Sequence, residues 1–173
     1  MNSTQATVSA EGRPVGSIEP SPCEGMEKSQ PTVLLVDDCR ELLWVAKEAF
    51  KSRGYHVTTA SSGEAALEVL IQKRFDLVIT DLHMGQINGF AVLKKARALD
   101  PEMPVIIWTG NGDVSSTAQA LGMNADGYLL KPFNLTELFR CADHCLAKAH
   151  ARRRDRISVP EQTDSPHSGV SVQ

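Results

Sequence analysis

Acidic, hydroxyl and ammonium side chains follow directly after four short apolar runs of this sequence. In chain order these side chains are Asp37, Asp38, Asp81, Thr109 and Lys131. If the apolar runs are parallel strands, their carboxyl ends meet at one edge of a sheet, which is where ligands bind in open α/β sheets. We therefore expect three carboxylates, a hydroxyl and an ammonium group to converge on one site.

These residue types suit the transfer of a phosphoryl group. Carboxylates about 4 Å apart repel each other by about 4 kcal/mol at an effective dielectric constant near 20, so three of them need a counter-charge. An all-oxygen set of ligands favours Mg²⁺ over Zn²⁺. Beside such a cation, one carboxylate can act as a nucleophile toward phosphorus. A lysine then binds one phosphoryl oxygen, and a threonine hydroxyl donates a hydrogen bond to another.

The spacing of the apolar residues predicts the elements that position these groups. Near-continuous apolar runs are typical of parallel strands that are buried on both faces. These runs are 32–36, 55–59, 75–80, 104–108 and 127–130. Stretches with apolar residues at helical spacing lie between them, as at 42–50, and after the last of them, at 135–146. Five strand–helix pairs of this kind predict a doubly wound α/β fold with a parallel sheet.

Local signals place three helix ends. Ser61 with Glu64, and Asn134 with Glu137, have the spacing of an N-cap and its reciprocal acid. Gly54 follows the first amphipathic stretch and is a natural helix stop.

Composition limits the class of protein. A chain of 173 residues that is 42% hydrophobic is long enough for one domain with its own core. Residues 1–30 and 150–173 are poor in large apolar residues, so we predict a disordered leader and tail around one domain at 31–149. No apolar run is long enough for a membrane span or a signal peptide, which predicts a cytoplasmic protein without membrane contact. The net charge of −3 makes nucleic-acid binding an unfavoured function.

Two features outside the acidic edge have alternative interpretations. The basic cluster 151–156 could contact an acidic partner or nucleic acid, but cations also suit the carboxyl end of a helix, which is the favoured interpretation. The cysteines are scattered and are interpreted as reduced thiols. Cys141 and Cys145 could form a partial metal site with His144, yet they also continue the apolar face of a helix, so core packing is favoured.

Along 31–148 the sequence resembles the receiver domain of response regulators, the phosphoacceptor proteins of two-component systems. The matching segments are Val36-Asp37-Asp38, Asp81-Leu82-His83-Met84-Gly85-Gln86-Ile87-Asn88-Gly89, Thr109-Gly110 and Gly127-Tyr128-Leu129-Leu130-Lys131-Pro132-Phe133. Each motif alone is weak, but four in order at predicted strand ends are specific. The resemblance implies a flavodoxin-like (βα)5 three-layer sandwich with the sheet order 2-1-3-4-5.

The resemblance implies roles for individual residues. Asp81 is similar to the family's phosphoacceptor, and Asp37 and Asp38 are similar to the acids that hold Mg²⁺ together with Asp81. His83 would add its backbone carbonyl to the metal.

Four further positions match the family's switch and phosphate-binding parts. Thr109 matches the switch hydroxyl, and Lys131 matches the lysine that contacts the phosphate. Tyr128 matches the aromatic side chain whose rotamer follows the hydroxyl. Pro132 matches a proline whose preceding peptide bond is usually cis.

Four residues depart from the pattern or stand at variable positions. Gly85 replaces the usual proline, which predicts a looser loop or a differently damped switch. His83 and Asn111 occupy positions that vary and that affect the access of water to the phosphoryl group. Trp108 is bulkier than expected before the switch threonine.

Taken together, these features predict a phosphoacceptor of a two-component system or phosphorelay. Asp81 would receive its phosphoryl group from a histidine kinase or a histidine phosphotransfer protein. The expected response is a switch of the face made by the fourth helix, fifth strand and fifth helix, which would bind a downstream protein. Without an output domain of its own, the chain would catalyse only its own phosphoryl transfer and dephosphorylation rather than act as an enzyme.

Three other functions compete with this one. A metal-dependent phosphatase usually has a second acid two residues after its nucleophile, where this chain has His83. A flavodoxin-like carrier needs a hydroxyl- and glycine-rich loop after the first strand, where Asp37 and Asp38 would repel phosphate. A phosphorylation-independent adaptor would bind its partner equally well as Asp81→Asn.

Taken singly, four of the residues also have ordinary structural explanations. Asp38 could cap a helix with Glu41 as its partner. Lys131 could be a solvated loop cation, Thr109 a turn residue, and Tyr128 a strand aromatic with its hydroxyl at the surface.

Overall fold

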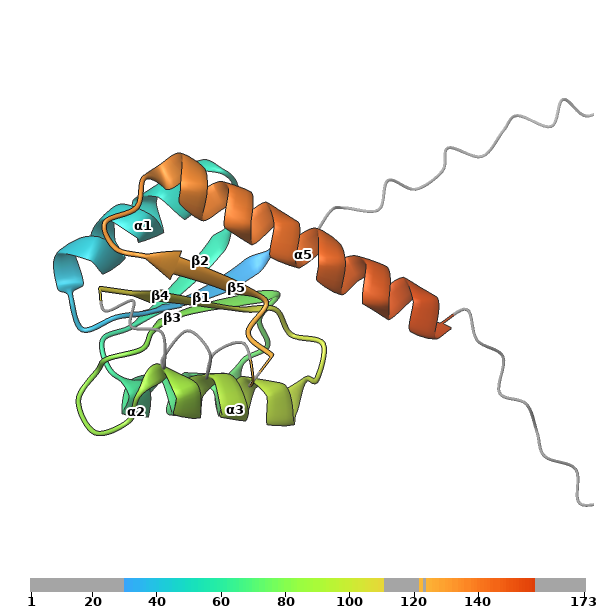
Figure 1. The fold of residues 1–173 in the computed structure, drawn as a ribbon, viewed down its shortest axis with the longest axis horizontal. Coiled ribbons are helices and arrows are strands. Elements are labelled where there is room, and N and C mark those ends of the chain that lie inside the picture. The colour runs from blue at the N-terminus through green and yellow to red at the C-terminus, as the bar shows by residue number, and fades with distance from the viewer. Residues whose placement is uncertain (1–29, 111–121, 123, 158–173) are drawn as a thin grey trace, which may run out of the picture.

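A parallel sheet lies between two layers of helices in the computed structural model, which describes residues 30–110, 122 and 124–157 (Figure 1). The elements are β1 (Thr32–Val36), α1 (Arg40–Ser52), β2 (His56–Ala60), α2 (Gly63–Gln72), β3 (Leu77–Asp81), α3 (Gly89–Leu99), β4 (Val105–Thr109), β5 (Gly127–Leu130) and α5 (Leu135–Ile157). The five-stranded sheet has the order β2-β1-β3-β4-β5. Both the doubly wound fold and the predicted strand order are confirmed.

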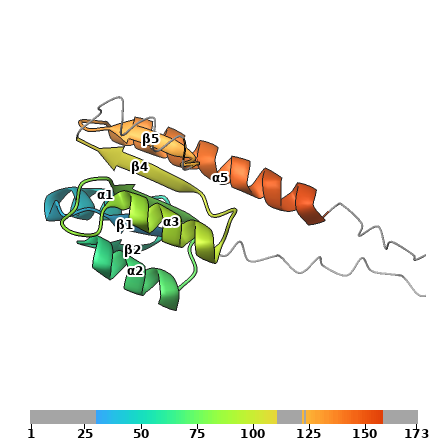
Figure 2. The ribbon, with the colours of Figure 1, turned by 60° about the horizontal axis from the view of Figure 1, so that its bottom comes forward.

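Alternate side chains of the strands pack into two separate hydrophobic cores, one on each face of the sheet. In a strand, successive side chains point to opposite faces of the sheet. Val33 and Leu35 pack with the buried residues of α1 and α5, whereas Leu34 and Val36 pack with those of α2 and α3. Figure 2 shows the same division, with α2 and α3 on the face away from α5. Because β3 and β4 are buried along their whole length, the carboxyl edge of the sheet rests on a rigid base.

Two of the three predicted helix ends are confirmed. The backbone N–H of Glu137 donates to Asn134 Oδ1 at 2.9 Å, and the N–H of Asn134 donates to Glu137 Oε2 at 3.1 Å, which is a complete capping box. Gly54 follows α1 with φ +82°, and its N–H donates to the carbonyl of Lys51.

The predicted start of α2 is wrong by one residue. The N-cap is Ser62, whose side chain accepts a hydrogen bond from the N–H of Ala65 at 3.3 Å, and the helix begins at Gly63. Adjacent serines both satisfy the N-cap preference, so the sequence could not separate Ser61 from Ser62.

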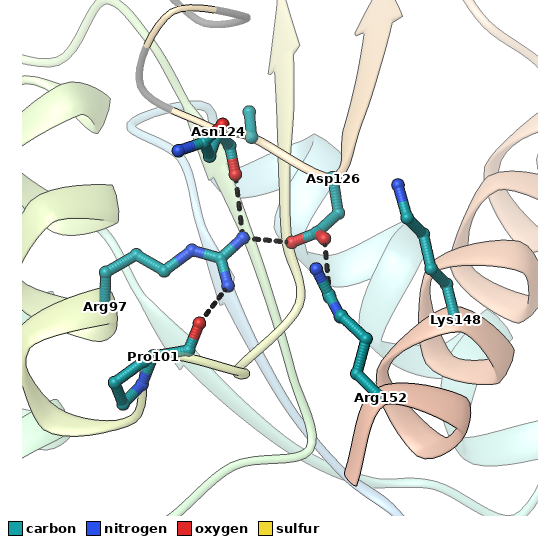
Figure 3. Close-up of a pocket in the computed structure, with 7 residues that line it drawn as sticks. Arg97, Pro101, Asn124, Asp126, Lys148 and Arg152 are labelled. Carbon is teal, nitrogen blue, oxygen red and sulfur yellow. Dashed lines mark hydrogen bonds and ion pairs between the residues drawn. The ribbon is translucent and has the colours of Figure 1, made fainter. Parts of the chain in front are cut away.

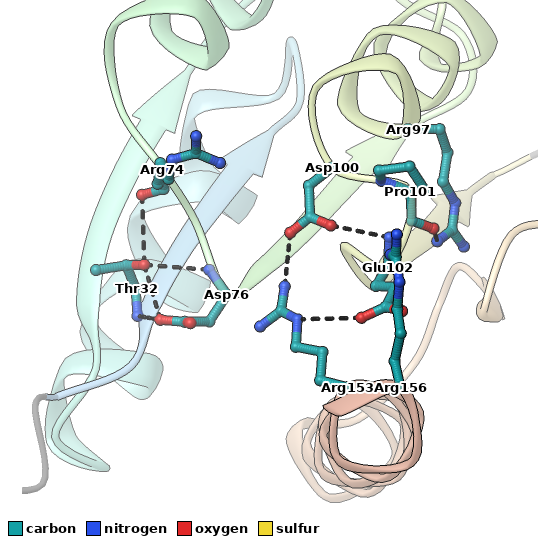
Figure 4. Close-up of polar contacts among 9 residues, drawn as sticks. All are labelled: Thr32, Arg74, Asp76, Arg97, Asp100, Pro101, Glu102, Arg153 and Arg156. Atoms are coloured by element: carbon teal, nitrogen blue, oxygen red, sulfur yellow. Dashed lines mark hydrogen bonds and ion pairs between the residues drawn. The ribbon is translucent and has the colours of Figure 1, made fainter. Parts of the chain in front are cut away.

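The predicted boundary of the C-terminal tail is also wrong, because α5 continues through 150–157. Its last turns are held by ion pairs to the loop between α3 and β4 (Figure 4). Arg153 contacts Asp100 at 2.6 Å and Glu102 at 3.8 Å, and Arg156 contacts Glu102 at 3.5 Å. These pairs join residues more than 50 positions apart, which a local composition argument cannot detect. Residues 1–29 of the predicted leader 1–30 and the remaining tail 158–173 lie outside the described residues.

Cys141 and Cys145 fit the interpretation as core residues, whereas Cys39 is exposed. Cys145 is buried and Cys141 half-buried, and both pack in the core between α5 and the sheet. A Cβ atom at Gly127 would lie only 2.6 Å from Cys141 Sγ, so β5 and α5 are in close contact there. Among the described helices, none is long and apolar enough to cross a membrane.

A buried carboxylate ties α5 to the rest of the domain. Asp126 has a side chain only 2% exposed, and it pairs with Arg97 of α3 at 2.6 Å and with Arg152 of α5 at 2.8 Å. It also accepts a hydrogen bond from the N–H of Val105 at 2.9 Å. One side chain therefore links α3, β4, the turn before β5 and the extended part of α5.

We expect Asp126→Asn to lower the free energy of unfolding by about 2–4 kcal/mol, because it leaves two partly buried guanidinium groups without their anion. Urea denaturation followed by circular dichroism measures this change. The matched control is Asp143→Asn, whose side chain is 53% exposed and pairs with Arg53 at 3.4 Å. That control should change stability by less than about 0.5 kcal/mol. Equal losses in the two variants would contradict a special role for Asp126.

Candidate functional site

Four strand ends bring the predicted site residues to one edge of the sheet. Asp37 follows β1, Asp81 is the last residue of β3, Thr109 is the last residue of β4, and Lys131 follows β5. Because β1 pairs with β3, β3 with β4 and β4 with β5, all in parallel, these ends are neighbours in space. The sequence placed Asp81 and Thr109 just after their strands, whereas the structure makes them the final strand residues.

The three carboxylates form one cluster. Oxygen atoms of Asp37, Asp38 and Asp81 all lie within 4.8 Å of one another, and no other group of this kind occurs among the described residues. Asp37 is fully buried and Asp81 is 6% exposed, whereas Asp38 is exposed. Two acids thus form the floor of the site, and the third faces solvent.

Lys131 bridges the two buried acids. Its Nζ donates to Asp37 Oδ2 at 2.5 Å and to Asp81 Oδ2 at 2.9 Å. Burial raises the pKa of Asp37 above its ordinary value, and the hydrogen bonds from Lys131 and from the N–H of Cys39 offset only part of that rise. Burial alone would lower the pKa of Lys131, but its bonds to the two carboxylates outweigh this effect and raise it. The lysine therefore remains a cation in contact with Asp81.

Backbone N–H groups bind the other oxygen of each buried acid. The N–H of Cys39 donates to Asp37 Oδ1 at 2.9 Å, and the N–H of His83 donates to Asp81 Oδ1 at 3.3 Å. Both carboxylates are thereby held in one orientation. The alternative in which Asp38 caps the first helix is not found, because the N-cap of α1 is Cys39.

The ring of Trp108 packs near the ammonium group of Lys131, a contact that the sequence did not predict. The indole is fully buried, its Nε1–H donates to the carbonyl of Val36 at 3.2 Å, and its ring stacks on Phe133 with centroids 5.6 Å apart. Lys131 Nζ lies 5.7 Å from the centroid of the indole, within the range of a cation–π contact. The only signal in the sequence was the unexpected bulk of this residue before Thr109.

The loop after Asp81 explains the departure at Gly85. Gly85 has φ +40°, in the left-handed region that favours glycine. The proline usual in the family fixes φ near −65° and could not adopt this conformation. Glycine therefore suits the path of this loop, whereas proline would not.

The remaining predicted residues have the following positions. Thr109 is buried at the end of β4, and Tyr128 is half-buried in β5 against the α2–α3 core. The Lys131–Pro132 peptide bond is cis, as the resemblance implied. Asn111 and most of the expected fourth helix lie outside the described residues. Coordination of a metal by the carbonyl of His83 remains a prediction.

The donor set fits the metal that the sequence predicted. All three clustered side chains offer carboxylate oxygens, which are the ligands that Mg²⁺ prefers, and the exposed Asp38 leaves one side open to water and to substrate oxygens. Two buried acids that share one lysine still leave the three-carboxylate cluster with an excess of negative charge, which a divalent cation would neutralise.

Comparison with known proteins identifies the family. Residues 33–143 match the response regulator receiver domain. The chain is 35% identical over 119 residues to the transcriptional regulatory protein ZraR of Escherichia coli K12, covering 69% of this chain and 27% of that protein. It is 31% identical over 122 residues to the DNA-binding transcriptional regulator NtrC of Klebsiella pneumoniae, covering 70% of this chain and 26% of that protein. The chain thus spans about a quarter of the length of these curated relatives.

Solved structures agree with the sequence comparison. A CheY-like response regulator receiver domain protein from Methanospirillum hungatei superimposes with a TM-score of 0.69 at 27% identity, covering 72% of this chain and 99% of that one. A receiver domain from Clostridium thermocellum gives a TM-score of 0.63 at 30% identity, covering 73% and 98%. The fold, the acidic edge of the sheet and the sequence match lead to one conclusion: the chain belongs to the response regulator receiver domain family.

Proposed function

We propose that this receiver domain accepts a phosphoryl group on the carboxylate of Asp81 from a phosphohistidine of a kinase or phosphotransfer protein. The observation that carries the proposal is the position of Asp81, which lies at the open edge of the sheet, within 4.8 Å of two further carboxylates and 2.9 Å from the Lys131 ammonium group. This arrangement provides a nucleophile, a place for a divalent cation and a fixed positive charge.

The proposed transfer is an in-line displacement at phosphorus. A bond forms between an Asp81 oxygen and the phosphorus atom, while the bond from phosphorus to the donor imidazole nitrogen breaks and leaves its electron pair on that nitrogen. Lys131, already held in contact with Asp81 Oδ2, would stabilise charge on a phosphoryl oxygen. Thr109, buried at the next strand end, would donate its hydroxyl to another oxygen.

Asp37, Asp38 and Asp81 would hold Mg²⁺, with the carbonyl of His83 as a further ligand. The ion would supply positive charge that offsets the repulsion between the carboxylates and the incoming phosphoryl oxygens. The roles of this chain's own residues are to position the acids and to hold the Lys131 ammonium group beside Asp81.

We further propose that phosphorylation changes a protein-binding face. The new group adds nearly two negative charges at the end of β3, which would draw Thr109 toward it and let Tyr128 follow. The affected surface would be the face of the fourth helix, β5 and α5, and the downstream partner a protein in the cytoplasm. ZraR and NtrC are transcriptional regulators by name, so an output on transcription is a second candidate, reached through other protein segments.

The experiment that tests the proposal is intact-mass analysis after incubation with acetyl phosphate and Mg²⁺. We expect a gain of one phosphoryl group, which should disappear when a chelator removes the metal. A panel of phosphohistidine donors serves as the second arm, because some receivers accept phosphoryl groups only from a protein. Failure with every donor would contradict the proposed function and favour an adaptor that does not depend on phosphorylation.

Mg²⁺ binding can be measured apart from phosphoryl transfer. The chain has two tryptophans, of which Trp108 is buried beside Lys131 and Trp44 is 66% exposed on α1. In the variant Trp44→Phe, we expect Mg²⁺ to change the fluorescence of Trp108 in a saturable manner. The change should be weakened about tenfold or more in Asp37→Asn, which removes one charged ligand. An unaltered titration in Asp37→Asn would show that the ion binds elsewhere.

A further inference from the structure

A second polar site lies at the opposite end of the sheet from Asp81. It is a pocket of about 440 Å³ between α3 and α5, beside the turn that leads into β5. Figure 3 shows Arg97 of α3 on one side, Lys148 and Arg152 of α5 on the other, and Asp126 between them. Asp126 precedes β5, so the pocket is at the amino ends of the strands, whereas Asp81 is at a carboxyl end.

The pocket has an excess of positive charge. Three cations line it, and the one carboxylate among its lining residues is already paired with Arg97 and Arg152. Their sum is a net charge of +2. The carboxylate oxygens of Asp126 already accept hydrogen bonds from two guanidinium groups and from the N–H of Val105.

Two buried hydrogen-bond donors of the arginines that line the pocket have no partner among the described residues. The Nε–H groups of Arg97 and Arg152 are both buried and unpaired in that part of the chain. Because these two nitrogen atoms have almost no accessible surface, a ligand in the pocket would contact the accessible ends of the cationic side chains instead. Arg97 is also fixed in place, because its other nitrogens donate to the carbonyls of Pro101 and Asn124 at 2.7 Å.

The helical extension of α5 builds this pocket. Arg152 belongs to the turns beyond His150, and the ion pairs of Arg153 with Asp100 and of Arg156 with Glu102 hold those turns against the α3–β4 loop. Without the extension, one of the three cations would be absent. These ion pairs, which keep α5 helical beyond His150, therefore also hold Arg152 in place beside the pocket.

We propose that this pocket binds a small phosphorylated molecule through its phosphoryl oxygens. A phosphate dianion matches the net charge of +2, and its oxygens can accept from guanidinium and ammonium donors on both sides at once. A bound phosphate would bridge α3 and α5 and thereby stabilise the extension. This site is separate from the acidic edge and does not depend on the proposed function of Asp81.

The test uses the full chain, inorganic phosphate as the probe and proton–nitrogen NMR spectra recorded with a chelator, so that no metal assists binding at the acidic edge. We expect saturable shifts of the backbone signals around Arg97, Lys148 and Arg152, with an affinity in the millimolar range. Lys148→Gln should weaken binding about fivefold or more, because it removes a charged donor. The matched control is Lys94→Gln, an exposed lysine of α3 that does not line the pocket and should bind as the wild type does.

Four results would overturn the proposal. Shifts that do not saturate, or equal weakening in Lys148→Gln and Lys94→Gln, would mean that phosphate only responds to the general charge of the surface. Shifts confined to the residues around Asp81 would place phosphate at the other end of the sheet. Succinate, a dianion with two carboxylates, should bind more weakly than phosphate, and equal binding of the two anions would contradict selection of phosphoryl oxygens.

Discussion

Asp81→Asn is expected to abolish phosphoryl incorporation from every donor while the fold remains intact. The amide has the shape of the carboxylate, and its single oxygen can keep one of the two hydrogen bonds that Asp81 accepts, either from Lys131 or from the N–H of His83. It lacks the negative charge that makes the side chain a nucleophile and a metal ligand. Intact-mass analysis after treatment with acetyl phosphate and Mg²⁺ measures the loss, and circular dichroism verifies the fold.

Two further variants serve as comparisons for the loss of phosphoryl incorporation in Asp81→Asn. Asp38→Asn removes the exposed acid of the cluster and should slow incorporation without preventing it, because Asp37, Asp81 and Lys131 remain in place. Asp143→Asn, on the exposed face of α5, should react as the wild type does. Normal incorporation into Asp81→Asn would mean that another residue carries the phosphoryl group.

Gly89→Ala is expected to cause the largest loss of stability of any single methyl addition near the site. Gly89 begins α3, and a Cβ atom there would overlap the backbone oxygen of Asp81 and press on the backbone of Leu82. Backbone cannot move aside as a flexible side chain can, so we expect a loss of about 3 kcal/mol or more. The melting temperature should fall by roughly 10 °C. Phosphoryl incorporation should slow as well, because the loop that orients Asp81 must shift.

A matched glycine provides the control. At Gly122 a Cβ atom would meet no atom of the described residues within 4 Å, and the residue is helical, so Gly122→Ala should keep or slightly raise stability. Thermal unfolding of the two variants side by side separates a local clash from a general effect of alanine. If Gly89→Ala melts like the wild type, the close packing of α3 on the strand end is incorrect.

The sequence predicted the sheet and its edge because both depend on local patterns. Runs such as 32–36 and 104–108 are apolar along their whole length, and parallel strands need that composition when helices cover both faces. The polar residues that follow them could then be assigned to one edge by a general rule for α/β sheets. Lys131 and Asp81, 50 positions apart, come within 2.9 Å for this reason alone.

Contacts between residues far apart in the chain could not be predicted from the sequence. The basic cluster 151–156 has the composition of a solvated end, and only its pairing with Asp100, Glu102 and Asp126 shows why it stays helical. The support of Lys131 by Trp108 likewise depends on the stacking of Phe133, which follows from the tertiary fold. In both cases, the partner lies on another element and no periodic pattern marks it.

The most direct test of the central claim is to identify the phosphorylated atom. An acyl phosphate on aspartate is reduced by borohydride to homoserine, whereas a phosphate ester on serine or threonine is not. After treatment with acetyl phosphate and Mg²⁺, borohydride reduction and proteolysis, tandem mass spectrometry should find homoserine in place of Asp81 and in no other position. Homoserine at Asp37 or Asp38, or phosphate that survives on a hydroxyl side chain, would contradict the assignment of Asp81 as the phosphoacceptor.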